Sequence, residues 1–403
     1  MLTNRNDAGQ RHDVIIIGGG IMGLSIAREL AEQRFGRIVL LERKHLAAGS
    51  TGKSGAILRQ HYSHEVTVGM ARESLGFYRS FEERFGIDIG FRSPGMVIVG
   101  DASARQALAE NISLQQRLGV DTQLLDAAAI RALEPRATVG DDEVAAWEPE
   151  ASYVRPRAAA EALGTVCRQL GVDVRVGAVV AEILHEAGAV VGVRTTQGET
   201  LAAPVVINSG GPWARQLLGD LGKDLPLSTI RPQQAFFEAT PEVQQAARIY
   251  GDLVHGIYWK PEDERWTRVG HLDYTGDLDV DPDDYDEGVS NDFIADVRAR
   301  ISRRLPCYGQ AVSWGGCGAL YTVTPDAHAL IGELTKCEAN ISGLYLVAGF
   351  SGHGFKLAPA IGRGVASLIT GSDPGAFRAD FFAIDRFRGK DRIKGQYQYG
   401  ILG

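Results

Sequence analysis

Cysteine is scarce in this sequence of 403 residues. The four cysteines, Cys167, Cys307, Cys317 and Cys337, form no Cys-x-x-Cys pair and no zinc-type spacing. This indicates a reducing compartment without a disulfide framework and predicts no metal site. Long apolar runs are missing as well, because no stretch approaches the length of a membrane span and residues 1–13 lack the apolar core of a signal peptide. We therefore expect a cytoplasmic protein with no membrane span.

Positive charge is also in short supply. The chain has 42 Lys and Arg residues against 50 Asp and Glu residues, a net charge of −8, and its basic residues are scattered. This excludes the basic patch of a nucleic-acid-binding protein. Hydrophobic residues make up 44% of the chain and charged residues 23%, the balance of an ordinary globular protein. A chain of this length can build two lobes with separate cores.

The stretch Asp13–Gly23, DVIIIGGGIMG, carries the strongest local pattern. Four apolar residues, Val14–Ile17, run into Gly18-x-Gly20-x-x-Gly23, and helical spacing follows. This order predicts strand, tight turn and helix, in which glycines allow the turn, a close approach to a pyrophosphate, and helix packing on the strand. Backbone N–H groups and the helix dipole would face the phosphates. The alternative is a turn that only packs helix on sheet.

A second apolar run, Ile38–Leu41, ends in Glu42. This acid follows Gly23 by 19 residues, close to the ~20 expected for the carboxylate that binds a ribose hydroxyl. Its charge would repel a 2′-phosphate. The two features together predict a dinucleotide site, and they fit NAD as well as FAD.

Further glycine-rich segments fall where a long cofactor would continue. Residues 46–64 are rich in glycine and serine and carry Lys53 and Arg59, although a plain surface loop has the same character. Residues 205–211, VVINSGG, repeat the pattern of an apolar strand that enters a glycine turn. Residues 349–371 predict a strand end, a glycine loop and a helix.

The predicted helices and strands divide the chain into two interleaved domains. A helix is expected over residues 66–85, residues 134–153 indicate acidic loop, and the acidic run 277–287 indicates a solvated surface to which we assign no chemistry. We expect a nucleotide-binding domain over residues 12–90, 150–225 and 318–385, a second, sheet-containing domain over 91–149 and 226–317, and a C-terminal tail over 386–403.

Several motifs agree with one family. They are DVIIIGGGIMG, the acid Glu42 with Arg43, GSTGKSGAILRQHYS (49–63), VVINSGGPWA (205–214), WGGCGALYTVTPDAHALIG (314–332) and AGFSGHGFKLAPAIG (348–362). In this order they resemble the D-amino-acid oxidase superfamily of flavoproteins, within the branch of sarcosine oxidases, glycine oxidases and N-methyl amino acid dehydrogenases. The segment 49–63 is most similar to the β-subunits of heterotetrameric sarcosine oxidases.

The resemblance implies an α/β fold in which a Rossmann-like FAD-binding domain is interleaved with a smaller substrate domain on a mainly antiparallel sheet. It implies bound FAD and oxidation of the C–N bond of a carboxylate-bearing amine, such as an amino acid or an N-methyl amino acid. The amine would lose a hydride to flavin N5, and the imine would then hydrolyse. The electrons would pass to O2 and give H2O2, or to a partner. An oligomer or a hetero-complex stays open.

The resemblance also implies the residues of the site. The cofactor set is Gly18, Gly20, Ile21, Met22, Gly23, Glu42, Arg43, Ser50, Thr51, Val180, Gly210, Gly352, Gly354, Phe355 and Lys356. The catalytic set is Lys356, Arg59, His353, Tyr321 and Arg268, and the substrate set is Arg59, Lys356, Trp259 and His271.

Two cations have the most specific implied roles. Lys356 matches the family lysine near flavin N1 and O2 and near the substrate carboxylate. Arg59 matches the arginine that pairs with this carboxylate. For each of them a surface cation is the alternative, and for His353 and Tyr321 the alternative is a structural side chain.

Three positions depart from the family pattern. Monomeric sarcosine oxidases attach FAD through a cysteine two residues before the tyrosine that Tyr321 matches. Ala319 stands there in this chain and Cys317 is out of register, so we expect non-covalent FAD. Ala56 replaces an arginine near the flavin. The family lysine thought to activate O2 aligns loosely with Arg268.

Three other functions stay open. A dehydrogenase would hand electrons to a quinone or a second flavin, and it would need partners because the chain has no cysteine cluster for an iron–sulfur centre. An NAD-dependent dehydrogenase fits the first motif but leaves 49–63 and the SGHGFK loop without a role. A flavin-binding scaffold would hold FAD that no amine reduces.

Overall fold

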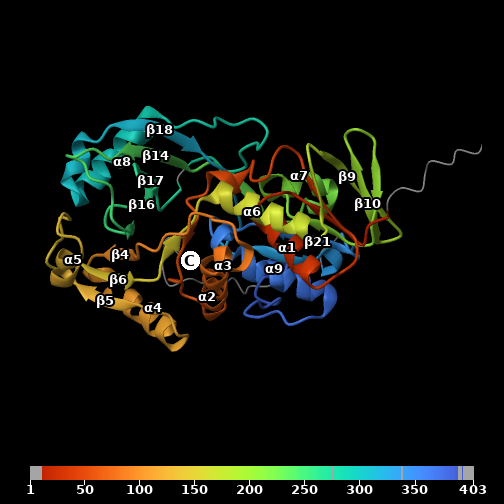
Figure 1. Ribbon diagram of the computed structural model, residues 1–403, viewed down its shortest axis with the longest axis horizontal. Helices are drawn as coiled ribbons and strands as arrows, with labels where there is room; N and C mark the ends of the chain where they lie inside the picture. Colours follow the sequence, from red (N-terminus) through yellow and green to blue (C-terminus); the bar gives the residue numbers. More distant parts are fainter. Residues whose placement is uncertain (1–10, 275, 337–338, 389–392, 394–403) are drawn as a thin grey trace, which may run out of the picture.

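The computed structural model describes residues 11–274, 276–336, 339–388 and 393. The N-terminal lead-in up to residue 10 and most of the predicted tail 386–403 lie outside the described residues. Two large sheets occupy separate halves of the molecule, with helices packed around them (Figure 1).

A six-stranded sheet forms the centre of the first half. Its strand order is β20-β21-β12-β1-β2-β8, and every pair is parallel except β20 with β21. All residues of β1 and β2 are buried, as expected for strands covered on both faces. The strands are β1 Val14–Ile17, β2 Ile38–Glu42, β8 Asp173–Val176, β12 Val206–Asn208, β20 Leu330–Glu333 and β21 Leu344–Ala348.

Different elements cover the two faces of this sheet. Val14 and Ile16 of β1 share a hydrophobic core with helices α1, α2, α6 and α9, whereas Ile15 and Ile17 pack toward the small sheet β9–β11 and helix α7. With both faces covered, the ligand crevice of such a sheet lies at its strand ends. The covering elements are α1 Ile21–Glu32, α2 Glu65–Arg79, α6 Pro156–Gln169, α9 Gly354–Thr370, α7 Ala214–Leu218, β9 Val180–Glu186, β10 Ala189–Thr195 and β11 Thr200–Ala202.

Two glycines fix the turn between β1 and α1. Gly18 has a φ of +106°, and a Cβ there would lie 2.6 Å from the backbone oxygen of Ser209. A Cβ on Gly23 would collide with the backbone oxygen of Gly18. Both contacts are with backbone atoms that cannot move aside, so only glycine allows α1 to start this close to the sheet.

A mainly antiparallel eight-stranded sheet forms the second half. Its order is β18-β14-β17-β16-β15-β4-β6-β5, and within this sheet, as far as the structure describes it, only β15 and β4 pair in parallel. Helices α5 and α8 pack on one face, and α4 packs on the other. The elements are β4 Met96–Gly100, β5 Gln123–Asp126, β6 Val144–Glu148, β14 Gln233–Glu238, β15 Ile249–Asp252, β16 Ile257–Glu262, β17 Trp266–His271, β18 Ser313–Gly318, α4 Arg105–Arg117, α5 Ala127–Leu133 and α8 Asn291–Arg304.

Two short sheets complete the fold. Strand β3, Ile57–Leu58, pairs with β7, Ser152–Tyr153, and strand β13, Ser228–Ile230, pairs with β19, Tyr321–Val323. The short helix α3, Phe81–Phe85, follows α2. Strand β3 runs directly into Arg59, so its pairing sets the start of the segment that carries this cation.

The structure confirms the expected α/β fold and corrects two local predictions. The expected helix over residues 66–85 is interrupted at Ser80 into α2 and α3. Residues 134–153, expected as acidic loop, contain β6 and β7. The division into two domains stays a prediction, and in the described part of the chain no helix combines the length and apolar character needed to cross a membrane.

Candidate active site

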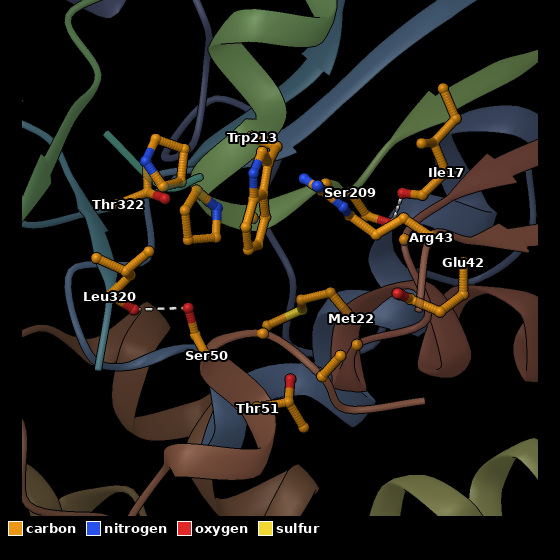
Figure 2. A pocket seen from close by; sticks show the side chains of 18 of the residues that line it. Ile17, Met22, Glu42, Arg43, Ser50, Thr51, Ser209, Trp213, Leu320 and Thr322 are labelled. Atoms are coloured by element: carbon orange, nitrogen blue, oxygen red, sulfur yellow. Dashed lines mark hydrogen bonds between the residues drawn. The ribbon is translucent and has the colours of Figure 1, made fainter. Parts of the chain in front are cut away.

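A cavity of about 550 Å³ lies at the carboxyl ends of the parallel strands. Its wall includes Ile17 at the end of β1, Glu42 at the end of β2, and Ser209 just after β12. Figure 2 shows Trp213 opposite Met22 in this space, with the Ser209 hydroxyl bonded to the Ile17 backbone oxygen. Cofactor and ligand sites commonly span about 300–1,000 Å³, so the cavity has the size and position of such a site.

Most of the cofactor residues predicted from the motifs line this cavity. Gly23 lies instead inside α1, and Lys356 lies one residue beyond the lining residue Phe355. Tyr321 from the catalytic set also lines the cavity. The lining members of the cofactor set are Gly18, Gly20, Ile21, Met22, Glu42, Arg43, Ser50, Thr51, Val180, Gly210, Gly352, Gly354 and Phe355.

The first turn of α1 opens onto the cavity. Its N-cap residue is Gly20, which has no side chain to offer as a cap, and the first turn contains no acidic residue. Thr51 Oγ1 accepts a hydrogen bond from the Ile21 N–H at 3.1 Å. An uncapped helix start with backbone N–H groups and the positive end of the dipole is a site for phosphate groups.

Glu42 is fixed at the end of β2. Its side chain is buried, and its two carboxylate oxygens accept hydrogen bonds from the N–H groups of Gly19 and Lys44, each at 2.8 Å. These bonds hold the carboxylate at the cavity wall, where the motif predicts the ribose contact.

The acidic segment 277–287 contributes to the cavity, which sequence analysis missed. Asp283 accepts hydrogen bonds from Arg43 at 2.8 Å and from Trp213 Nε1 at 2.9 Å. Farther along the segment, Lys53 donates to Glu287 at 2.7 Å. Pro282, Asp283, Tyr285 and Glu287 of this segment therefore form part of the cavity wall. No local sequence pattern predicts these contacts, because an acidic run is typical of a solvated surface and its cationic partners lie far away in the sequence.

Lys356 lies in the first turn of α9. The turn before the helix is tight, with φ angles of 50° at Ser351 and +88° at Gly352, and the ring of Tyr321 lies against this glycine. The Tyr78 hydroxyl donates to the Phe355 oxygen at 2.8 Å and holds the turn from α2. Burial, together with the nearby charge of Arg59, lowers the pKa of Lys356 well below its usual range.

Arg59 lies beside Tyr62 and close to His353. The Arg59 guanidinium stands over the Tyr62 ring at 4.1 Å and donates to the His61 backbone oxygen. The Tyr62 hydroxyl is 3.1 Å from His353 Nδ1, and His353 is the N-cap of α9. The structure thus brings together three predicted residues, Arg59, His353 and Lys356. It adds Tyr62, a residue of the motif 49–63 to which the sequence assigns no role.

Arg268 lies at the boundary between the two halves. Its Nε donates to Glu262 at 2.7 Å, and its Nη1 donates to the Lys53 backbone oxygen at 3.0 Å and to the Gln234 side chain. These contacts place Arg268 on the sheet face that turns toward the predicted cofactor loop 49–63.

Lys260 is a second buried cation on this face, and sequence analysis missed it. It pairs with Arg268 across strands β16 and β17, and its Nζ lies 2.9 Å from Glu262. Its ammonium also lies 4.1 Å from the centre of the Tyr153 ring. Burial lowers the pKa of Lys260 to about 8, against the opposing effect of the Glu262 charge.

The structure turns two predicted substrate residues away from this face. His271 Nε2 lies 2.7 Å from Asp296 Oδ2 of α8, and Trp259 is fully buried and stacks on Tyr250 at 4.5 Å. Side chains alternate along a strand, so Trp259 and His271 lie on the α8 side while Arg268 lies on the opposite side. The structure gives no support to their prediction as substrate residues.

The described cysteines lie away from the cavity wall. Cys317 pairs with Gln234 in the eight-stranded sheet, and burial raises the pKa of its thiol. The wall includes Leu320 and Tyr321 but none of Cys167, Cys307 and Cys317, the cysteines that the structure describes. This agrees with non-covalent attachment of a cofactor.

The chain is similar to known flavoenzymes over most of its length. A family model described as FAD dependent oxidoreductase (DAO) matches residues 13–368. The peroxisomal sarcosine oxidase of Homo sapiens is 30% identical over 93% of this chain and 96% of its own length. The formaldehyde-forming 4-methylaminobutanoate oxidase of Paenarthrobacter nicotinovorans is 28% identical over 93% of this chain, which spans 45% of that relative.

Solved structures show the same fold. L-proline dehydrogenase from P. horikoshii superimposes with a TM-score of 0.84, 24% identity and coverage of 94% of this chain and 98% of that chain. Glycine oxidase from Geobacillus kaustophilus superimposes with a TM-score of 0.79, 23% identity and coverage of 93% and 99%.

The residues of the cavity fit FAD. The glycine turn leaves room that a Cβ would fill, the uncapped start of α1 suits the diphosphate, and Glu42 is held where a ribose contact is expected. The match to a flavoenzyme family favours FAD over the NAD alternative. The chain belongs to the DAO family of FAD-dependent oxidoreductases.

Proposed function

We propose that this protein oxidises the C–N bond of an amine that carries a carboxylate, such as an amino acid or an N-methyl amino acid. The observation that carries the proposal is a pair of buried cations: Lys356, which follows the cavity-lining Phe355, and Arg59, whose charge acts on Lys356. Relatives named sarcosine oxidase and 4-methylaminobutanoate oxidase support this class of substrate.

The surroundings of Lys356 disfavour its positive charge. Arg59 is 4% exposed and Lys356 is 9% exposed, so both lie in a region of low dielectric. The causes that lower the pKa of Lys356 are burial and Arg59, and no carboxylate among the described residues counteracts them. A ligand carboxylate would offset the charge of Lys356, and the planar guanidinium of Arg59 could hold it through two hydrogen bonds.

The same charges favour the reactive form of the amine. An amine gives up hydride readily only when its nitrogen is unprotonated, and nearby cations lower the pKa of an amine. FAD, when bound, supplies the two-electron oxidation. Lys356 and the positive end of α9 would stabilise negative charge at the reacting end of the cavity. A bound carboxylate would also orient the substrate.

A dehydrogenase that passes electrons to a partner is the second candidate. The chain is 26% identical to the sarcosine oxidase subunit beta of Arthrobacter sp over 93% of this chain and 91% of that subunit. The name of this relative supports a role as one subunit of a complex. O2 as the acceptor, with H2O2 as its product, is the first candidate, and the cytoplasmic location stays a prediction.

The test is anaerobic mixing of the yellow holoenzyme with a panel of amino acids and N-methyl amino acids, followed by air. Loss of the flavin absorbance band with a member of the panel is the expected result. Rapid return of the band in air would assign O2 as the acceptor, whereas slow return would assign a partner. No bleaching by any carboxylate-bearing amine would contradict the proposal.

A further inference from the structure

Glu148 is a buried acid that neither the motifs nor the proposed function uses. It ends strand β6 and is 2% exposed. Its Oε1 accepts hydrogen bonds from the Gln60 N–H at 2.8 Å and from Gln60 Nε2 at 3.3 Å, and its Oε2 accepts one from the His61 N–H at 3.1 Å. One carboxylate thus binds two successive backbone N–H groups of the segment that starts with Arg59.

The segment 59–62 is held on its other side as well. Gln115 of α4 donates to the Tyr62 backbone oxygen at 3.0 Å. Burial lowers the pKa of His61 to about 3, so this imidazole is neutral near pH 7 and adds no charge. Every residue of the segment is buried. Contacts from the second half of the molecule therefore hold the backbone of the segment that follows Arg59.

Glu148 is also electrostatically coupled to Arg59. Burial raises the pKa of Glu148 to about 7, and the bonds from Gln60 and the charge of Arg59 oppose this rise. A buried carboxylate without hydrogen-bond or charged partners strongly destabilises the folded protein. Its partners here are the residues that follow Arg59 in the chain.

We infer that Glu148 is a positioning residue for Arg59: by binding the Gln60 and His61 N–H groups it fixes the guanidinium over the Tyr62 ring, in the place where the substrate carboxylate binds. This inference rests on the proposed function, because it takes Arg59 as the carboxylate ligand. A displacement of about 1 Å in such a group can cost up to ~100-fold in rate. The affinity for carboxylates therefore depends on a residue that does not touch the ligand.

The experiment titrates the FAD-loaded holoenzyme with benzoate and acetate, and with benzamide and acetamide as matched uncharged probes. Binding is followed by the change in the flavin absorbance spectrum. The variants are Glu148→Gln, Arg59→Ala and the double variant, and Glu150→Gln is the control. Glu150 is a neighbouring acid whose carboxylate pairs with the half-exposed Arg79.

Glu148→Gln is expected to raise the Kd of the carboxylates about tenfold and to change the Kd of the amides less than about twofold. In the Arg59→Ala background the same substitution should have no further effect, because coupled residues are not additive. Glu150→Gln should behave as the wild type.

The failure of this inference is distinguishable from the failure of the proposed function. If Arg59→Ala weakens the carboxylates but Glu148→Gln does not, or if Glu148→Gln weakens acids and amides equally, the positioning role is wrong. If Arg59→Ala leaves carboxylate binding unchanged, or the wild type binds neither acid, the proposed function is wrong. If Glu148→Gln does not fold, Gln60→Ala removes one donor to Glu148 and should show the same split between acids and amides at a smaller size.

Discussion

Lys356 is buried, and its surroundings disfavour the charged form of its side chain. Burial and the Arg59 charge both disfavour the ammonium form, and no carboxylate among the described residues favours it. Residues with strongly perturbed pKa values gather at functional sites, where ligand or cofactor supplies the missing partner. Three consequences can be measured at the scale of single residues.

Lys356→Met should slow flavin reduction while FAD stays bound. The substitution keeps the length and apolar stem of the side chain but removes the charge that would stabilise the reacting end of the cavity. Anaerobic stopped-flow reduction with a substrate from the panel measures the rate, and the flavin-to-protein ratio of the purified variant measures FAD retention. Reduction at the wild-type rate would remove Lys356 from the mechanism.

Arg59→Ala should weaken carboxylate-bearing substrates by ~1.5–3 kcal/mol, the typical loss of one charged hydrogen bond. The dissociation constant comes from the dependence of the reduction rate on substrate concentration. Arg79→Ala is a suitable control, because Arg79 is a half-exposed arginine on α2 that pairs with Glu150. Equal substrate affinities in the wild type and in Arg59→Ala would rule out this role.

The same lysine should destabilise the FAD-free protein. Because the pKa of Lys356 is lower in the folded state than in the unfolded state, the unfolded chain binds more protons between the two values, and stability rises with pH across that window. Lys356→Met should therefore unfold at a higher temperature than the wild type near pH 7, with a smaller difference near pH 10. Thermal unfolding of both FAD-free proteins at the two pH values tests this. A lower melting temperature for the variant near pH 7 would be evidence that burial of Lys356 does not destabilise the folded protein.

At the scale of elements, the starts of two helices meet one cavity. Gly20, Ile21 and Met22 from α1 and Gly354 and Phe355 from α9 line the same space. The positive ends of both helices suit a cofactor that carries phosphates and a substrate that carries a carboxylate. The close packing of α1 on β1 makes this arrangement depend on glycine.

Gly23→Ala should destabilise the protein and lower its FAD content. The new Cβ would collide with the Gly18 backbone oxygen and push the start of α1 out of place. Gly76→Ala in the interior of α2 is the matched control, because a Cβ there meets nothing within 4 Å and should stabilise by ~0.5–1 kcal/mol. Thermal unfolding and flavin content measure both variants. A Gly23→Ala protein with wild-type melting temperature and FAD content would contradict the packing argument.

At the scale of the whole molecule, local motifs predict the dinucleotide-binding part of the site better than the part that holds Arg59 and Lys356. The strand–turn–helix at Asp13–Gly23 and the acid Glu42 could be predicted because short-range chain geometry determines their form. The position of Arg59 beside Lys356 needed the family resemblance, since these residues lie far apart in the sequence. The fold class, the flavoenzyme family and FAD are confirmed, and the roles of the individual site residues stay predictions.

Features that depend on tertiary contacts could not be predicted in the same way. The side of the sheet that Trp259 and His271 face depends on strand register, and an error of one residue reverses it. Glu148 falls in a segment that reads as acidic loop, yet it ends a buried strand. The segment 277–287 has the composition of a solvated loop, and its contacts to Arg43 and Lys53 exist only in the folded chain.

The most direct test of the account is whether the enzyme recognises the carboxylate of its substrate. The measurement is anaerobic stopped-flow reduction of the wild-type holoenzyme by an N-methyl amino acid and, in parallel, by the same amine without its carboxylate. We expect reduction by the acid to be at least about tenfold faster at equal concentration, because the loss of one charged contact costs ~1.5–3 kcal/mol. Equal rates with both amines, or reduction only by the amine that lacks the carboxylate, would contradict this prediction.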